Sequence, residues 1–224
     1  MDALLLDFNG VVVNDEPLHF TAFRAVLAEE GITLDEGTYY ADYLGWDDQA
    51  SFRQAFRRAG RPLEPRAADR LVARKAVRYA ALAERDLPLV PGVRGFVRGA
   101  AERWRVAVAS GALRTEIAFG LERAGIAGLI ATIVSAEDVG VTKPDPASFR
   151  LAATRLGARR AVVVEDSLPG LLAARALGAG CVMLATSHPA GALAAGDRVW
   201  DSFEGHDSAE LDALFRTLGV PPDV

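Results

Sequence analysis

The chain has 224 residues, half of them hydrophobic, and a formal net charge of -5. This length fits one large domain, or a core domain with a smaller insert, and the apolar content is sufficient for a buried core. The mild acidity argues against nucleic acid as the main partner, because nucleic-acid binding requires a concentrated basic face.

Cysteine usage and the N-terminal sequence bear on the compartment. A single cysteine, Cys181, cannot build a disulfide framework, so a reducing compartment is expected. The first residues reach Asp2 and Asp7 without a basic region or a long apolar segment, which predicts neither a signal peptide nor a membrane anchor. We therefore expect a soluble, cytoplasmic protein with no membrane partner.

The first predicted strand, residues 3–8, is an apolar run that carries Asp7 near its end. Almost a hundred residues then pass before the next convincing strand. Three segments in this interval have helical patterns: 18–30, 47–60 and 65–85. This predicts an all-helical cap domain, residues 15–86, inserted into a core domain formed by 1–14 and 87–224. Both junctions would lie beside the strand end that carries Asp7, where the insert could act as a lid.

The rest of the chain alternates apolar runs with helical patterns. The runs lie at 105–110, 129–135, 161–166 and 181–186. Apolar runs without alternation are typical of strands buried on both faces, and the helical segments between them end at glycine. This alternation predicts an α/β fold with a doubly wound, Rossmann-like parallel sheet, whose chemistry lies at the carboxyl ends of the strands.

Polar residues follow several of these predicted strands. They are Asp7, Ser110, Lys143, Glu165 and Asp166. Carboxylate oxygens suit Mg²⁺, a cation and a hydroxyl suit the oxygens of a phosphoryl group, and a carboxylate can attack phosphorus. Only two of the 25 basic residues are lysine, Lys75 and Lys143, which favours a local reason for each. No His or Cys cluster has the spacing of a zinc site.

Four stretches of the sequence carry a resemblance to a known family. They are DFNGVVVND, VASGA, VTKPDPASF and VVVEDSLPGLLAARALGAG, spread in this order over nearly the whole chain, with PGV at 91–93. In these motifs the chain resembles the haloacid dehalogenase superfamily, in particular its helical-cap phosphatases and phosphomutases such as β-phosphoglucomutase and phosphoglycolate phosphatase. The cap segment ARKAVRY, 73–79, is also similar to a segment of β-phosphoglucomutase and its relatives.

The resemblance implies a role for each matching residue. Asp7 is expected to be the nucleophile that forms an aspartyl-phosphate. Mg²⁺ is expected to bind its other oxygen, the backbone carbonyl of Asn9 and the carboxylate of Asp166, with Glu165 as a further ligand, directly or through water.

The resemblance also implies how the phosphate is bound. Ser110 and Lys143 are expected to neutralise and orient the phosphoryl group. Gly10 and Gly111 are expected to border the substrate, since glycine permits a close approach of the backbone to phosphate. The expected partner is a small phosphorylated metabolite. The sequence does not determine which ester binds or the oligomeric state, and a monomer is compatible with it.

Asn9 departs from the family pattern. The family's first motif reads Asp-x-Asp-Gly, and its second Asp protonates the leaving alcohol and later activates water. General acid–base catalysis is typically worth about 10²–10⁴-fold, so the amide predicts slow turnover. Three explanations stay open: an engineered change, a natural variant with altered chemistry, or a protein that binds phosphate esters with little or no turnover. Deamidation of Asn9 to Asp, to which an Asn-Gly sequence is prone, is a minor fourth route.

Four cap residues are candidates for substrate contact: His19, Trp46, Arg53 and Lys75. His19 lies at the start of the first cap helix, and its titration range suits a substitute proton donor. We hypothesise that His19, with Asp15 as the second candidate, partly replaces the missing carboxylate. The leading prediction is a Mg²⁺-dependent phosphatase, and the alternative enzyme is a sugar-phosphate mutase. The stretch WDDQ at 46–49 argues against the mutase, since the family's mutases often have Arg there.

Overall fold

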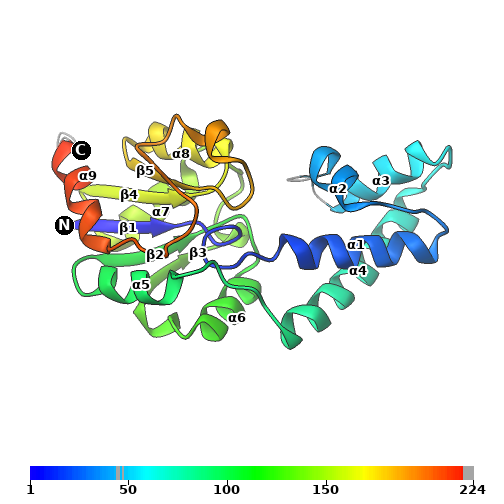
Figure 1. Cartoon of the computed structure of the whole chain (residues 1–224), viewed down its shortest axis with the longest axis horizontal. Helices are drawn as coiled ribbons and strands as arrows, with labels where there is room; N and C mark the ends of the chain where they lie inside the picture. The colour runs from blue at the N-terminus through cyan, green and yellow to red at the C-terminus, as the bar shows by residue number, and fades with distance from the viewer. Residues whose placement is uncertain (44–45, 47, 219–224) are drawn as a thin grey trace. The chain divides into compact units, whose positions relative to one another are not determined.

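The computed structural model of the chain describes residues 1–43, 46 and 48–218 (Figure 1). One sequence prediction falls outside these residues, namely the start of the predicted helix 47–60 at Asp47. By its internal contacts the chain divides into two compact units, Met1–Asn14 with Pro88–Val224, and Asp15–Leu87. We call them the core unit and the helical unit. The predicted cap, 15–86, ends one residue before the helical unit does, and its role as a lid stays a prediction.

The core unit contains one parallel sheet. Among the described residues the strand order is β3-β2-β1-β4-β5-β6 (Figure 1). The strands are β1 Asp2–Leu6, β2 Arg105–Ala109, β3 Ile130–Val134, β4 Arg160–Glu165, β5 Gly180–Leu184 and β6 Arg198–Trp200. The prediction of a doubly wound α/β fold is confirmed. The sequence analysis missed β6, because this edge strand has three residues and no apolar run marks it.

The non-alternating apolar runs are buried on both faces of the sheet. Successive residues of a strand point to opposite faces, yet Leu4, Leu5 and Leu6 of β1 are all fully buried. Ala3 and Leu5 belong to one apolar cluster with Phe149 and Leu171. The helices of the core unit are α5 Val93–Ala101, α6 Arg114–Ala124, α7 Ala147–Leu156, α8 Leu168–Leu177 and α9 Leu211–Thr217.

The order of the sheet places the end of β1 beside the end of β4. Leu6 pairs with Val108 of β2 and with Val164 of β4. Glu165 pairs with Met183 of β5. Residues that follow β1, β4 and β5 therefore emerge next to one another at the carboxyl edge of the sheet.

The helical unit has its own apolar core. Its helices are α1 Glu16–Glu29, α2 Glu36–Asp42, α3 Asp48–Arg58 and α4 Pro65–Arg85. Aromatic side chains fill the space between them: Phe20, Phe23, Tyr39, Tyr43 and Phe52. The sequence analysis missed α2, which has seven residues and begins at an Asp35 side chain that accepts the N–H of Thr38.

Candidate active site

A tight loop follows β1 and carries Asp7. The Asp7 N–H donates to the Val164 carbonyl at 3.0 Å, so the hydrogen-bonded ladder of β1 and β4 continues through this residue. The Phe8 carbonyl then accepts the N–H groups of residues 11–13 at 2.8 to 3.3 Å, which turns the chain back. At Gly10 the backbone has φ of 70°, in the left-handed region that favours glycine.

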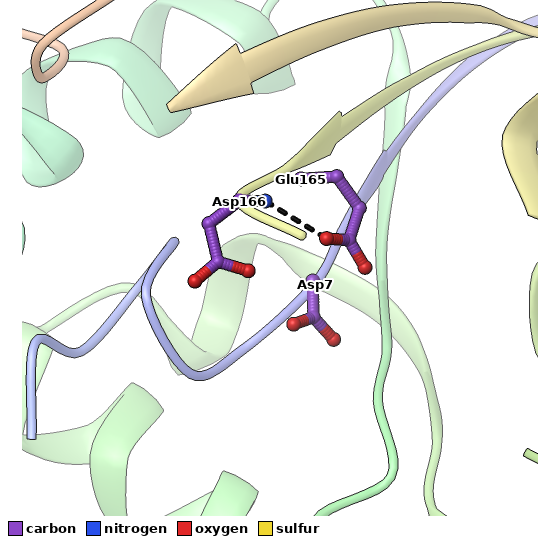
Figure 2. Close-up of side chains that lie close together, drawn as sticks. All are labelled: Asp7, Glu165 and Asp166. Atoms are coloured by element: carbon purple, nitrogen blue, oxygen red, sulfur yellow. Dashed lines mark hydrogen bonds between the residues drawn. The ribbon is translucent and has the colours of Figure 1, made fainter. Parts of the chain in front are cut away.

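Three carboxylates gather at the ends of β1 and β4. Oxygen atoms of Asp7, Glu165 and Asp166 lie within 4.8 Å of one another, and all three residues are buried (Figure 2). They are close because Asp7 follows Leu6 and Glu165 follows Val164, which are paired residues of the sheet. The predicted convergence of Asp7, Glu165 and Asp166 is therefore present in the structure.

Lys143 joins two of these carboxylates. Its Nζ donates to Asp7 Oδ1 at 2.6 Å and to Glu165 Oε1 at 2.5 Å, and it lies 4.7 Å from the centre of the Phe149 ring. With all four groups ionised, three negative charges and one positive charge leave a net charge of about −2. That charge and the hard oxygen donors match a divalent cation such as Mg²⁺.

Glu165 is held by the protein on both oxygens. While Oε1 accepts from Lys143, Oε2 accepts the N–H groups of Asp166 and Ser167 and the Ser167 hydroxyl, each at 2.8 Å (Figure 2 draws the Asp166 bond). The carboxylate also lies where a side chain at Gly170 would be, 1.9 Å from its Cβ position. Burial alone would raise the pKa of Glu165, but Lys143 and the Ser167 hydrogen bonds lower it below its usual value. Glu165 is therefore a fixed, ionised group.

In the other two carboxylates, Asp7 and Asp166, burial disfavours the ionised form. Burial raises the pKa of Asp7 despite the attraction of Lys143. Burial, reinforced by the negative charges of Glu165 and Asp7, raises the pKa of Asp166 well above its usual value. A divalent cation between Asp7 and Asp166 would favour their ionised forms, because its charge opposes the repulsion between them. The residues present thus fit a bound metal ion.

Ser110 and Gly111 lie at the end of β2, beside Lys143. The Ser110 N–H donates to the Val134 carbonyl at 3.0 Å, and its hydroxyl accepts the Ala112 N–H at 3.3 Å. Ser110, Gly111 and Lys143 line one cavity of about 310 Å³. The structure therefore brings the predicted phosphoryl-binding residues to a common space within the core unit.

The cap candidates lie in the helical unit. Lys75 of α4 is 5% exposed, forms an ion pair with Asp48, and lies 2.9 Å from His19 Nδ1. The His19 ring stacks on Tyr79 at 4.3 Å between centres, and its Nε2 lies 3.4 Å from Asp15 Oδ2. Lys75 and His19 thus belong to one network that links α1, α3 and α4.

The other two cap candidates stand apart from this network. Trp46 is 49% exposed, and its backbone N–H donates to the Tyr43 carbonyl at 3.0 Å. Arg53 donates to Gln49 Oε1 at 2.9 Å on the same helix. Substrate contact by these two residues stays a prediction.

Two residues of the site escaped the sequence analysis. The Ser187 hydroxyl donates to Asp166 Oδ2, and the Thr186 hydroxyl donates to the Gly10 carbonyl at 2.6 Å. Both follow β5, at the same edge of the sheet as the carboxylates. The available signal was a pair of hydroxyl residues directly after a buried apolar run.

Comparison with known proteins identifies the family. The family model of haloacid dehalogenase-like hydrolases matches residues 1–178. Validoxylamine A 7'-phosphate phosphatase from Streptomyces hygroscopicus subsp. limoneus is 30% identical over 86% of this chain and 90% of its own length. Fructose-1-phosphate phosphatase YqaB from Escherichia coli is 32% identical over 78% of this chain and 92% of its own length.

A solved structure supports the same assignment. CbbY from Rhodobacter sphaeroides, in complex with phosphate, has a TM-score of 0.78 and 28% identity over 94% of this chain and 98% of its own. An Asp-to-Asn variant of CbbY has been solved in complex with xylulose-(1,5)bisphosphate. The chain belongs to the haloacid dehalogenase-like hydrolases, as the sequence motifs predicted. Within the described residues, no helix has the length and apolar character needed to cross a membrane.

Proposed function

We propose that this protein is a Mg²⁺-dependent phosphatase that hydrolyses a small phosphate monoester through an aspartyl-phosphate on Asp7. The observation that carries the proposal is the buried cluster of Asp7, Glu165 and Asp166, with Lys143 bonded to two of its members. The family of hydrolases and the relatives named phosphatases support a phosphoric monoester hydrolase.

The residues of the core unit supply the nucleophile and the phosphoryl-binding groups for both halves of the reaction. A carboxylate oxygen of Asp7 attacks phosphorus while the bond from phosphorus to the ester oxygen breaks. The leaving alkoxide takes its proton from solvent water, because the Asn9 amide cannot supply one. Water then attacks the phosphorus of the aspartyl-phosphate, which releases phosphate and restores the Asp7 carboxylate. Lys143 and Ser110 hold the phosphoryl oxygens and balance their charge.

We propose Asp7, Asp166 and the backbone carbonyl of Asn9 as the groups that hold Mg²⁺. When bound, the ion neutralises negative charge on the transferring phosphoryl group. Glu165 was predicted as a further ligand, and its bonds to protein donors on both oxygens favour an orienting role. Glu165 accepts from the Asp166 N–H and from Lys143 Nζ, and it therefore orients both the proposed metal ligand and the ammonium group.

Asn9 supports a second candidate function, a phosphometabolite-binding protein with little or no turnover. An amide cannot pass a proton to the leaving alkoxide or take one from water. Lys143, Ser110 and the three carboxylates are all present beside the amide, so binding would persist. The same change within a phosphatase predicts turnover lowered by about 10²–10⁴-fold.

The names of the relatives support a substrate class. Two of them are named as phosphatases of validoxylamine A 7'-phosphate and of fructose 1-phosphate. We propose a sugar or sugar-like phosphate as the partner, with a mutase as the alternative reaction on such a substrate. We also propose the cytoplasm as the compartment, for which the single, buried cysteine is the support.

The testing experiment is phosphate release from a panel of sugar phosphates, with and without Mg²⁺, by this chain and by Asn9→Asp. We expect Asn9→Asp to be faster by about two to four orders of magnitude on at least one ester. Asp7→Ala, as the control, should release none. Equal rates for this chain and Asn9→Asp would mean that another residue moves the proton.

A labelling experiment separates the two candidate functions. The impaired phosphatase predicts rapid Mg²⁺-dependent labelling of Asp7 by the substrate, followed by slow release. Tight binding without labelling, and without turnover by Asn9→Asp, would establish the binding protein instead. Isomerised sugar phosphate as the product, without free phosphate, would indicate the mutase.

A further inference from the structure

The loop that follows β5, residues 185–188, reaches the carboxylate cluster from outside the sequence motifs. We call it the β5 loop. The Ala185 N–H donates to the Trp200 carbonyl of β6 at 2.8 Å, which anchors the start of the loop to the sheet. Since Glu165 pairs with Met183, the residues just beyond β5 lie level with those just beyond β4.

Two neighbouring side chains of the β5 loop bind two parts of the site. The Ser187 hydroxyl donates to Asp166 Oδ2. The Thr186 hydroxyl donates to the Gly10 carbonyl at 2.6 Å. Asp166 directly follows β4, and Gly10 lies in the tight loop after β1, residues 7–13, which we call the Asp7 loop. The β5 loop therefore connects these two segments by side-chain hydrogen bonds.

The packing at this point leaves little freedom. A Cβ at Gly10 would lie 1.9 Å from Asp166 Oδ2 and 3.1 Å from Ser187 Oγ. The next residue, His188, has a buried Nδ1 that lacks a hydrogen-bond partner within the described chain. A buried polar atom without a partner is unfavourable and calls for an explanation. The hydrogen bonds of Thr186 and Ser187 provide that explanation, because they hold the loop in a position where His188 Nδ1 has no partner among the described residues.

We propose that Ser187 is a positioning residue for Asp166 and that Thr186 does the same for the Asp7 loop, an inference that rests on the proposed function. Asp166 carries its charge in a buried site and repels Asp7 and Glu165, so its carboxylate needs a fixed direction. By binding Oδ2, Ser187 leaves Oδ1 for the cation. Thr186 binds the carbonyl of Gly10, the residue that follows Asn9, and the Asn9 carbonyl is the proposed backbone ligand.

The test is Mg²⁺ binding, measured by calorimetry on the full chain without substrate. Loss of a hydrogen-bonding partner of a metal ligand typically costs about 10- to 100-fold in metal affinity. We expect Ser187→Ala to weaken Mg²⁺ binding by that factor and Ser187→Thr, which keeps the hydroxyl, to restore most of it. Thr186→Val should weaken binding as well. Ser202→Ala is the matched control, because Ser202 also lies in the core unit and its hydroxyl accepts a local bond from the Glu204 N–H.

A double variant shows whether Ser187 acts through Asp166. In the absence of Mg²⁺, removal of the Ser187 hydroxyl should lower the Tm of the unaltered chain but have little effect on the Tm in an Asp166→Ala background, because the bond to Asp166 Oδ2 is already absent there. Unchanged Mg²⁺ binding by Ser187→Ala would overturn the positioning role and leave the proposed phosphatase intact. If the unaltered chain bound no Mg²⁺, the proposed function and this inference would both be overturned.

Discussion

At the scale of the single residue, Gly10 is a position where both the backbone conformation and the surrounding atoms require glycine. It combines a φ of 70° with a space that Asp166 Oδ2 already fills. We expect Gly10→Ala to abolish phosphate release and to weaken Mg²⁺ binding, because Asp166 or the Asp7 loop has to move. Gly125→Ala is the control: Gly125 has a φ of 66°, and nothing lies within 4 Å of its Cβ position. It should lower stability by only about 1 kcal/mol and keep activity. Equal activity losses in both variants would contradict the clash.

Cys181 shows how burial lowers the reactivity of a thiol toward alkylating reagents. It lies in β5, is fully buried, and burial raises the pKa of its thiol to about 12. The thiolate is the reactive form, so we expect no alkylation of the folded protein by iodoacetamide at pH 8. The same reagent should modify Cys181 fully in guanidinium chloride. Mass spectrometry of the two samples decides the matter, and rapid modification of folded protein would contradict the expected inertness.

The His19 hypothesis can also be made specific at this scale. An ammonium only donates hydrogen bonds, so Lys75 makes Nδ1 of His19 an acceptor and places the ring proton on Nε2, 3.4 Å from Asp15 Oδ2. Nitrogen NMR should show the Nε2–H form for His19. His206 is the internal contrast, because its Nδ1 lies 3.2 Å from the Glu210 carboxylate and has to donate. An Nδ1–H form at His19 would contradict the geometry.

Turnover tests the catalytic part of that hypothesis. If His19 supplies the proton that Asn9 cannot, His19→Ala should lower the residual phosphate release of this chain further, while having little effect in the Asn9→Asp background. Unchanged release in both backgrounds would end the idea that His19 replaces the carboxylate. Asp15→Asn, assayed in the same way, tests the second candidate.

At the scale of the element, Asp138 fixes the segment that delivers Lys143. Its carboxylate accepts the Ser135 N–H at 2.8 Å and the Ser135 hydroxyl at 2.9 Å, and it pairs with Arg155 of α7 at 2.8 Å and with Arg114 of α6. The Ser135 N–H and Arg155 bonds hold the pKa of Asp138 below its usual range. Asp138 therefore joins the end of β3 to two helices before the chain turns toward the site.

We expect Asp138→Asn to lower the free energy of unfolding by about 1–3 kcal/mol at pH 7, because charged hydrogen bonds are lost. A carboxyl whose pKa is lower in the folded state stabilises the protein above its unfolded pKa of about 3.9 and loses that effect as the pH falls. The difference between this chain and Asp138→Asn should therefore shrink below about pH 4. Urea unfolding at pH 7 and at pH 3 measures it, with the exposed Asp201 changed to Asn as the control. A difference that did not depend on pH would contradict the role of the charge.

At the scale of the whole molecule, the sequence predicted what local patterns determine. Buried strands such as β1 and β4 could be predicted from the sequence because both of their faces are apolar. The place of Asp7 and Asp166 at the carboxyl edge could be predicted because the sheet is parallel. The short elements β6 and α2 could not be predicted, since a segment of three to seven residues is too short to show a clear hydrophobic period. The bond from Ser187 to Asp166 joins segments 21 residues apart and depends on the order of β4 and β5, which no local pattern encodes. The sequence placed the reactive groups but not the contacts that orient them.

The carboxylate cluster makes one prediction about the stability of the whole chain. In the metal-free protein, buried Asp7, Glu165 and Asp166 repel one another, and Lys143 offsets part of this repulsion. A ligand that binds only the folded state stabilises it by about 2.7 kcal/mol at a free concentration of 100 times its Kd. We therefore expect Mg²⁺ to raise the Tm measurably and Asp166→Asn to abolish that rise. In the absence of Mg²⁺, Asp166→Asn should itself be at least as stable as the unaltered chain, because it removes a repelled buried charge. Calcium and sodium chloride at matched ionic strength separate site binding from screening. A rise that was equal for sodium chloride, or that persisted in Asp166→Asn, would show that the ion acts elsewhere on the molecule.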